Sequence, residues 1–473
     1  MADVTHVKSP VKGPRPTELC APSASTHSRV SPGGDLMADA MVGAEASSRH
    51  KKVGVLGAAA LVAGSMIGSG VYLLPATMGA IGSISILGWL VATLAAVSIA
   101  GVFVWLSSEV AGSEGIPGYV QAGLGPFFGA QTAVLFWTSC WAGTVAVALA
   151  AAGAAGFLIP ALAEPAARLA VTIAIIWTAV GLSWIGPRAV ARTEGFTLGI
   201  GLLPVILAAT VGWFFFRSDV FLASWNPTNL SLGQAVGGSA LNAFWAFLGM
   251  ECAAAAAGVV RDPTRNVPRA TMLGVLGAAA LYIAATSAIM GILPADVLAK
   301  SNAPFADAAR AALGAAVGAA IAVCAFLRTG GCVTGWTLVI AETSRGAADQ
   351  GVFPKVFRTR PGERASPINL VTAGVLMTAF ALATANPSLA KQFSTIINAV
   401  SLLSLYTYVL AALSLARIGG RFAGVRRVGA LVTAAVAIAF AALLISGGKP
   451  LELALSLVPM PVAALLHLWL RRR

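Results

Sequence analysis

The stretch AGSMIGSGV, residues 63–71, decides the fold, and it lies inside the first long apolar run of the chain. Five of its nine residues are small and poorly suited to a helix: three are glycine and two are serine. Each glycine in a helix interior costs about 1 kcal/mol relative to alanine, so a continuous helix is disfavoured. Two interpretations fit. Small residues allow close helix packing in a membrane, and a discontinuous helix frees backbone N–H groups that can hold a carboxylate.

The composition around this stretch indicates a protein surrounded by lipid. Of 473 residues, 58% are hydrophobic and 10% are charged, and the mean hydropathy is +0.83. A soluble domain carries about 25% charged residues. The apolar residues form runs of about twenty or more, which is enough to cross a bilayer core. Continuous runs rather than strict alternation favour helices over a barrel, so we predict an all-α integral membrane protein.

Prolines and glycine pairs divide the chain into twelve predicted spans. Residues 1–50 are rich in Ser, Pro, Gly and Ala and are expected to form a disordered cytoplasmic tail. Residues 51–473 form the membrane domain. The spans are expected near 52–78, 83–108, 127–160, 167–186, 191–216, 232–258, 269–293, 307–343, 367–386, 393–416, 428–447 and 451–470.

The net charge of +13 does not indicate a nucleic-acid partner, because of how the basic residues are distributed. The basic residues lie in short loops between apolar runs, where they determine membrane topology. After the first span, seventeen Lys and Arg lie in predicted inside segments and five in outside loops. This bias predicts an even number of spans with both termini in the cytoplasm.

Cysteine and histidine usage gives no sign of a metal site, cofactor or disulfide framework. Four of the five cysteines lie inside apolar runs, without a CxxC pair, and three of the four histidines lie in the N-terminal tail. No catalytic dyad or phosphate-binding loop favours an enzyme.

The sixth span contains the stretch NAFWAFLGMEC at 242–252, which offers a counterpart to the break in the first span. Glu251 within this apolar run costs at least about 2.5 kcal/mol at a bilayer centre. It fits either a structural ion pair or protonated acid, or a cation or proton site. Gly249 beside it marks a second break. Because spans one and six each begin a set of five, they predict inverted repeats at about 52–217 and 232–417 with a site between them.

Aromatic residues near these breaks suit a cation. The face of an aromatic ring attracts a cation within about 6 Å of its centroid. Trp245 precedes Glu251, Trp336 lies in the eighth span, and Phe136 and Thr144 lie eight residues apart in the third span. Packing is the alternative role for each tryptophan.

Arg328 stands in the middle of the eighth span, where its charge cannot easily reach an interface. It must face the bundle interior, a water cavity or an acid. The acids in or near apolar runs are Glu194, Glu251 and Asp307. We hypothesise that Arg328 supplies a fixed internal positive charge where other transporters bind a coupling cation.

Five stretches resemble the basic amino-acid/polyamine antiporter group of the amino acid–polyamine–organocation superfamily, and bacterial arginine/agmatine antiporters in particular. The stretches are GSMIGSGVYLLPA (64–76), GPFFGAQTAVLFWTSCWAG (125–143), FWAFLGMECAAAAAGVVRDPTRNVPRAT (244–271), SAIMGILP (287–294) and GWTLVIAETSRGAADQGVFP (335–354).

This resemblance implies a LeuT-type 5+5 inverted repeat, with discontinuous helices 1 and 6 and two extra helices within 428–470. It implies a gate and proton-sensing group formed by Phe136, Glu251 and Tyr406. The substrate-binding residues that it implies are Ser65, Ile67, Gly68, Ser69, Gly70, Cys140, Thr144, Trp245, Leu248 and Trp336.

The resemblance also implies exchange of a cationic amino acid for its decarboxylated amine, as in arginine/agmatine antiport and acid resistance. It implies a homodimer in the bacterial inner membrane. Arginine/agmatine antiporters have Asn where Ser65 and Thr144 stand and Tyr where Phe136 stands, so the exact substrate pair stays open. Proton-coupled uptake of an amino acid is the alternative function.

Overall fold

The computed structural model describes residues 54–68, 71–110, 115–251, 260–358 and 366–471. Every element assigned in these residues is a helix, as expected for an all-α membrane protein. The predicted tail, Ser69 and Gly70 lie outside the described residues. The elements are α2 (Val55–Met66), α3 (Leu74–Gly79), α4 (Ser85–Glu109), α5 (Gly115–Leu124), α6 (Pro126–Leu158), η1 (Pro160–Ala163), α7 (Pro165–Ile185), α8 (Pro187–Thr210), η2 (Val211–Phe215), α9 (Ser218–Ala223), α10 (Leu232–Phe244), η3 (Trp245–Phe247), α12 (Pro263–Ile292), α13 (Ala295–Leu298), α14 (Pro304–Leu313), α15 (Ala315–Asp349), η5 (Lys355–Phe357), α16 (Pro367–Ala383), α17 (Leu389–Gly419), α18 (Gly424–Ser446), α19 (Pro450–Leu457) and α20 (Pro459–Arg471).

Nine helical segments of the described chain are long and apolar enough to cross a membrane. Helices also lie at the other three predicted spans, but α2, α10 and α16 are shorter, with 12, 13 and 17 residues. The count of twelve and the inverted repeat therefore stay predictions. The predicted start of the ninth span at 367 is correct, because proline fits the first turn of a helix, where its missing N–H is not needed. Helix α16 begins at Pro367, and α8 and α12 also begin at prolines, Pro187 and Pro263, before the predicted starts at 191 and 269.

The prediction of one continuous eighth span over 307–343 is wrong at its start. Gly314 has a φ of +95°, in the left-handed region, so α14 ends at Leu313 and α15 begins at Ala315. Glycine adopts this conformation without the steric penalty that a Cβ would bring. The long helix then continues to Asp349.

The first apolar run is interrupted, in agreement with the glycine-rich stretch. The first helix, α2, ends at Met66, and α3 begins only at Leu74, next to Pro75. Ile67, with ψ of 47°, has already left the helical conformation. The sixth run leaves the α-helix after Phe244 and passes through the short η3. Residues 252–259, the rest of that predicted span, lie outside the described residues.

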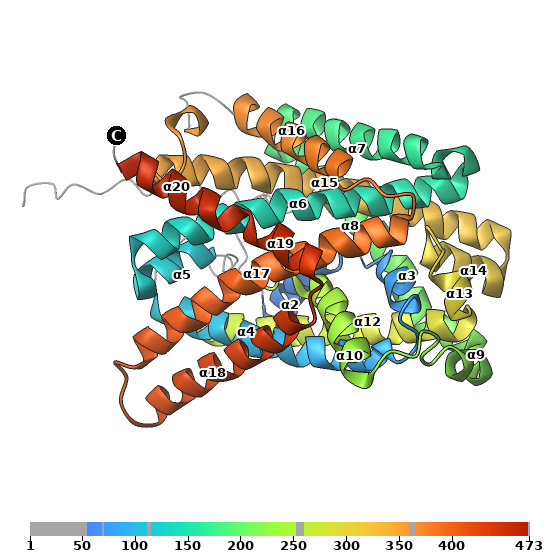
Figure 1. Cartoon of the computed structure of the whole chain (residues 1–473), viewed down its shortest axis with the longest axis horizontal. Helices are drawn as coiled ribbons and strands as arrows, with labels where there is room; N and C mark the ends of the chain where they lie inside the picture. Colours follow the sequence, from blue (N-terminus) through green and yellow to red (C-terminus); the bar gives the residue numbers. More distant parts are fainter. Residues whose placement is uncertain (1–53, 69–70, 111–114, 252–259, 359–365, 472–473) are drawn as a thin grey trace, which may run out of the picture. The chain divides into compact units, whose positions relative to one another are not determined.

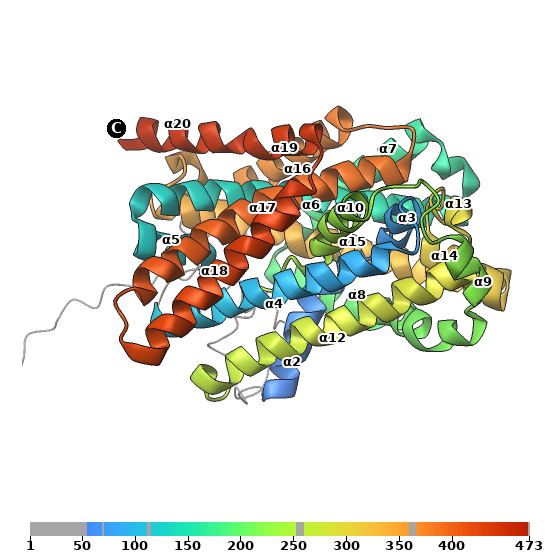
Figure 2. The same cartoon turned by 60° about the horizontal axis from the view of Figure 1, so that its bottom comes forward.

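Helix α6 lies at the centre of the bundle and packs against α5, α7, α15 and α17 (Figure 1). Helix α4 packs against α10 and α12, and α2 packs against α12 (Figure 2). Helices α8 and α15 approach closely because glycine replaces larger side chains at their contact. Cβ atoms added at Gly331 and Gly335 would overlap the side chains of Thr197 and Glu194. Small residues at helix crossings are typical of membrane bundles.

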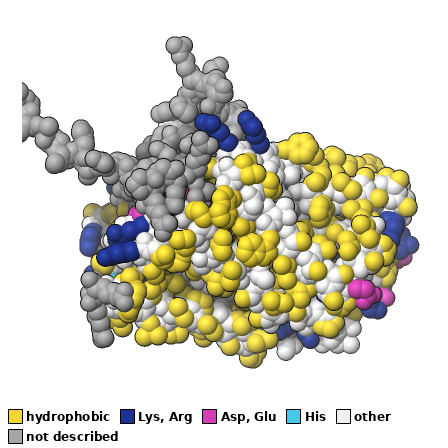
Figure 3. Space-filling model, turned by 90° about the horizontal axis from the view of Figure 1, so that it is seen from above, with side chains coloured by type: hydrophobic (Ala, Val, Ile, Leu, Met, Phe, Trp, Pro, Cys, Tyr) yellow, Lys and Arg dark blue, Asp and Glu magenta, His cyan; other side chains and the backbone are white. Residues whose placement is uncertain are grey.

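The outer surface is apolar, as lipid contact requires. Hydrophobic side chains cover most of the face in Figure 3, and the charged groups there gather toward its edges. Exposed apolar residues include Phe214 at 87% and Val425 at 89%. The described chain is therefore a multi-pass membrane bundle.

Candidate functional site

A cavity opens where α6, α15, α17 and the segment after α10 meet. The space between its walls, including the open solvent at its mouth, is about 410 Å³. The residues that line it are Phe136, Ser139, Cys140, Gly143, Thr144, Val147, Trp245, Leu248, Glu251, Trp336, Val400 and Ser404. Seven of the site residues expected from the sequence are thus brought to one place: Phe136, Cys140, Thr144, Trp245, Leu248, Glu251 and Trp336.

One face of α6 supplies half of this lining. Its residues from Phe136 to Val147 recur at helical spacings of three and four, so they point to the same side. Ser139, Gly143 and Val147 were not predicted, although this periodicity could have extended the predicted pair Phe136 and Thr144. Val400 and Ser404, four apart on α17, were also missed.

Two features position Trp245: the end of α10 and the glycine at position 143 on α6. It is 4% exposed and begins η3, where the chain turns away from the α-helix. A Cβ added at Gly143 would lie 2.9 Å from Trp245 Cη2 and 3.2 Å from Cζ3. Gly143 therefore lets the indole pack directly against the α6 backbone. The buried Nε1 of Trp245 finds no hydrogen-bond partner in the described part of the chain.

Glu251 is held by two hydrogen bonds beside the second break. The hydroxyl of Tyr408 donates to Glu251 Oε2 at 3.0 Å, and the N–H of Gly249 donates to the same oxygen at 3.1 Å. Gly249 has a φ of +104°, and this left-handed turn folds the backbone so that its N–H reaches the carboxylate. Glu251 is the one charged residue among the described residues that line the cavity.

The tyrosine that reaches Glu251 is not the one predicted for the gate. The gate was predicted to include Tyr406, whereas the hydroxyl that donates to Glu251 belongs to Tyr408, and the gating role stays a prediction. Two residues along an α-helix change the direction of a side chain by about 200°, so the two rings face opposite sides of α17. The ring of Tyr408 also packs edge-on against Phe103 and Phe244, with centroids 5.3 and 6.3 Å away.

Arg328 lies away from this lining, at the broken end of α2. Of the three acids considered from the sequence, Glu194 is its partner: Arg328 Nη1 lies 3.7 Å from Glu194 Oε1. Asp307 pairs with Arg310 at 2.6 Å, and Glu251 accepts from Tyr408. Ile67 and Gly68, which were expected in the substrate site, lie next to Arg328.

Three further predicted binding residues cannot be placed. Ser69 and Gly70 lie outside the described residues, and the side chain of Ser65 is likewise not described. Their part in substrate binding stays a prediction.

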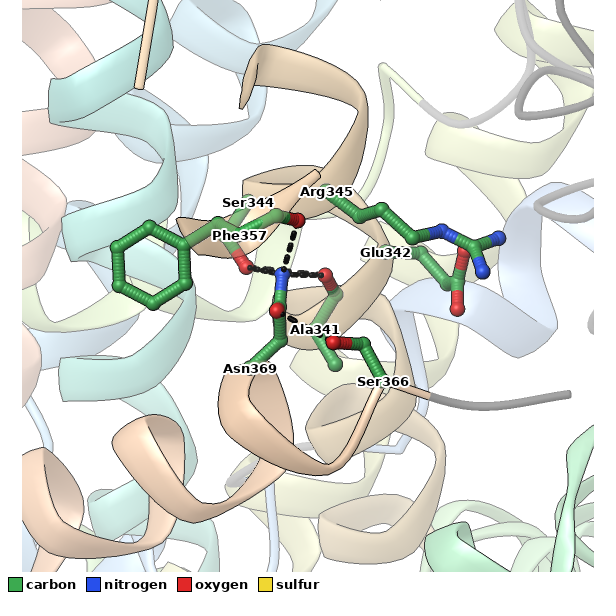
Figure 4. A network of polar contacts seen from close by, with 7 residues as sticks. All are labelled: Ala341, Glu342, Ser344, Arg345, Phe357, Ser366 and Asn369. Atoms are coloured by element: carbon green, nitrogen blue, oxygen red, sulfur yellow. Dashed lines mark hydrogen bonds and ion pairs between the residues drawn. The ribbon is translucent and has the colours of Figure 1, made fainter. Parts of the chain in front are cut away.

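The motif at 335–354 forms a polar network at one end of α15 (Figure 4). The amide nitrogen of Asn369, on α16, donates to Ser344 Oγ at 2.8 Å, to the Ala341 carbonyl at 3.1 Å and to the Phe357 carbonyl at 3.3 Å. Glu342 and Arg345 form an ion pair on another side of the same helix. These contacts join α15 to α16 and η5, so residues 341–345 of this motif have a structural role, whereas Trp336 of the same motif lines the cavity.

The described residues contain no group of three or more His, Cys, Asp or Glu side chains that could hold a metal ion. The cavity itself offers aromatic faces, hydroxyls and one carboxylate for reversible binding.

Comparison with known proteins identifies relatives over nearly the whole chain. The family model for amino acid permeases matches residues 53–469. The cadaverine/lysine antiporter of Escherichia coli strain K12 is 33% identical over 415 residues, which cover 86% of this chain and 92% of that protein. The putrescine transporter PotE of Haemophilus influenzae is 32% identical over 370 residues, covering 78% and 85%. PotE of Escherichia coli K12 is 32% identical over 368 residues, covering 78% and 84%.

Proposed function

Because this chain belongs to the amino acid permease family of membrane transporters, we propose that it exchanges a cationic amino acid for the amine formed by its decarboxylation. The observation that carries the proposal is the cavity, in which Trp245 and Trp336 line the same space as the carboxylate of Glu251. The printed names of the relatives, a cadaverine/lysine antiporter and putrescine transporters, support the same class of substrate. The resemblance seen in the sequence to basic amino-acid/polyamine antiporters agrees with these relatives.

The cavity suits an organic cation for two physical reasons. A ring face attracts an ammonium or guanidinium group by about 0.5 to 2 kcal/mol, more when water is excluded. In its ionised form Glu251 adds a negative charge, and its hydrogen bonds from Tyr408 and Gly249 fix the position of the carboxylate. The buried indole N–H of Trp245 provides a donor for a carboxylate or hydroxyl of the substrate.

The carboxylate of an amino acid would bind at the interrupted first helix. The resemblance implies that Ser69 and its glycine neighbours hold this carboxylate, since N–H groups freed at a break in a helix can bind an anion. The amine product lacks this carboxylate and would be held by the cation site alone. Both exchange partners therefore share the aromatic cavity, which is the requirement for exchange by alternating access.

The charge balance gives the exchange a physiological direction. Decarboxylation consumes one proton and converts an amino acid of net charge +1 into an amine of charge +2. Import of the former and export of the latter removes one positive charge from the cell in each cycle. We propose this role in acid resistance, in the bacterial inner membrane with both termini in the cytoplasm, and as a homodimer.

Proteoliposomes test the proposal directly. Vesicles containing the purified chain are loaded with agmatine, cadaverine or putrescine, or left empty, and uptake of labelled arginine, lysine or ornithine is measured. We expect uptake to require an internal amine, with arginine/agmatine as the pair that the resemblance implies and lysine/cadaverine as the pair named for a relative. Uptake into empty vesicles that follows a proton gradient would instead support proton-coupled uptake. Failure of all basic substrates to compete would overturn the cation site.

A further inference from the structure

Arg328 places a charge inside the bundle and joins three elements there. Its side chain is 2% exposed, in the middle of α15. Its Nε donates to the carbonyl oxygen of Ile67, 3.4 Å away, at the broken end of α2. Its Nη1 lies 3.7 Å from the carboxylate of Glu194 on α8. A charge in this environment is expensive, so its partners are expected to have a function.

The backbone makes room for this arginine from two further directions. A Cβ added at Gly68 would overlap the guanidinium group, and one added at Gly201 would overlap the aliphatic part of the side chain. Near Gly201, the hydroxyl of Tyr72 donates to the Gly201 carbonyl and ties the chain beyond the break to α8. The space around Arg328 is therefore built by residues of α8 and of the interrupted first run.

The oxygen atoms around the guanidinium are those that bind cations. The last carbonyl groups of a helix have no partners within the helix and form the negative end of its dipole. The Ile67 carbonyl follows directly on α2, and Glu194 adds a full negative charge. Carbonyl and carboxylate oxygens are the ligands of hard metal ions, and unwound carbonyls at broken helices hold cations in transporters.

We propose that Arg328 is a tethered cation: its guanidinium fills a cation site formed by the Ile67 carbonyl and the Glu194 carboxylate. It thereby holds the broken end of α2 in place without a diffusible ion. A charge attached to α15 cannot dissociate during the cycle, so no alkali ion is bound or co-transported at this position. Arg328 acts on the substrate cavity through α2 and is a positioning residue.

Chemical rescue tests this proposal with Arg328→Ala, Arg328→Lys and the control Arg168→Ala. Arg168 lies on α7, away from the break in the first helix. It is also buried, at 4% exposure, and donates to the carbonyls of Asn386 and Pro387 at 2.7 and 3.1 Å. Two measurements are made in sodium, choline and low-millimolar guanidinium chloride. They are the melting temperature of the purified protein and exchange of whichever substrate the wild type transports.

The wild type is expected to be indifferent to the three salts. Arg328→Ala should lower exchange at least about tenfold, because it leaves the Glu194 charge and the Ile67 carbonyl without their cation. Guanidinium or sodium should restore at least about a third of that loss and raise the melting temperature, since a ligand that binds only the folded state stabilises it. Arg328→Lys should retain most exchange, and neither ion should rescue Arg168→Ala.

Three results would overturn the proposal. One is an Arg328→Ala variant that exchanges substrate at the wild-type rate and does not respond to added ions. Another is an inactive, folded Arg328→Ala protein that neither ion restores or stabilises. If Arg328→Ala does not fold, Glu194→Gln decides: unchanged exchange and melting temperature would refute the site, and a tenfold loss without rescue by cations would support it. The melting-temperature response does not depend on the substrate, so it separates this proposal from the proposed exchange.

Discussion

Adding one methyl group at Gly143 should disturb the substrate cavity through Trp245. The Cβ of Gly143→Ala would lie 2.9 Å from Trp245 Cη2, 3.2 Å from Cζ3 and 3.5 Å from Val400 Cγ1. Carbon atoms in favourable contact lie about 3.5 to 4.0 Å apart, so the tip of the indole has to retreat by about 0.6 to 1 Å. Because Trp245 is 4% exposed, it has little free space to move into.

The expected cost follows from overpacking, which destabilises well-packed sites by about 1 to 3 kcal/mol. If this cost falls on the substrate-binding arrangement, KM rises by a factor of about 5 to 150. The assay is the concentration dependence of exchange in proteoliposomes, with the amount of folded protein measured in the same preparation. Gly330→Ala, on α15, is the matched control because a Cβ there meets no atom within 4 Å. A KM for Gly143→Ala within twofold of the control would refute the assignment of Trp245 to the substrate site.

Three further variants test other contacts. Tyr408→Phe removes the hydroxyl that donates to Glu251. Because hydrogen bonds to charged groups contribute about 1.5 to 3 kcal/mol, the exchange rate should change about tenfold or more, whereas Tyr406→Phe should leave it unchanged. A large effect of Tyr406→Phe and none of Tyr408→Phe would instead support the prediction of Tyr406 as the gate residue. Trp336→Leu should raise the KM for basic substrates by about 2- to 30-fold, the equivalent of 0.5 to 2 kcal/mol, and equal affinity would exclude ring contact with the cation. Asn369→Ala removes the donor shared by three acceptors, so the melting temperature should fall while KM stays constant; a changed KM with unchanged stability would contradict a structural role.

Features determined by local chemistry were predictable from the sequence. Proline at the first helical turn marks the start of α16 at its predicted position, Pro367. The glycine-rich stretch marks the interruption after Met66, because glycine weakens a helix regardless of what surrounds it. The apolar runs alone identified an all-helical membrane protein.

Features determined by three-dimensional packing were not predictable. Three acids were open as partners of Arg328, and only the crossing of α8 and α15 selects Glu194. A shift of two residues on α17 distinguishes Tyr408 from Tyr406, and periodicity does not show which face of that helix meets Glu251. Gly314 was read as part of a span because a single glycine is tolerated within helices, whereas its positive φ ends α14.

The central claim, exchange of a cationic amino acid for its amine, is tested most directly by the charge that it moves. Vesicles loaded with cadaverine or agmatine are clamped at different membrane potentials with potassium and valinomycin, and the initial rate of lysine or arginine entry is measured. The account predicts faster entry as the vesicle interior becomes more positive, because one net positive charge leaves in each cycle. Exchange of an amino acid for itself should not respond. Equal responses of both exchanges to the potential, or entry that needs no internal amine, would contradict the account.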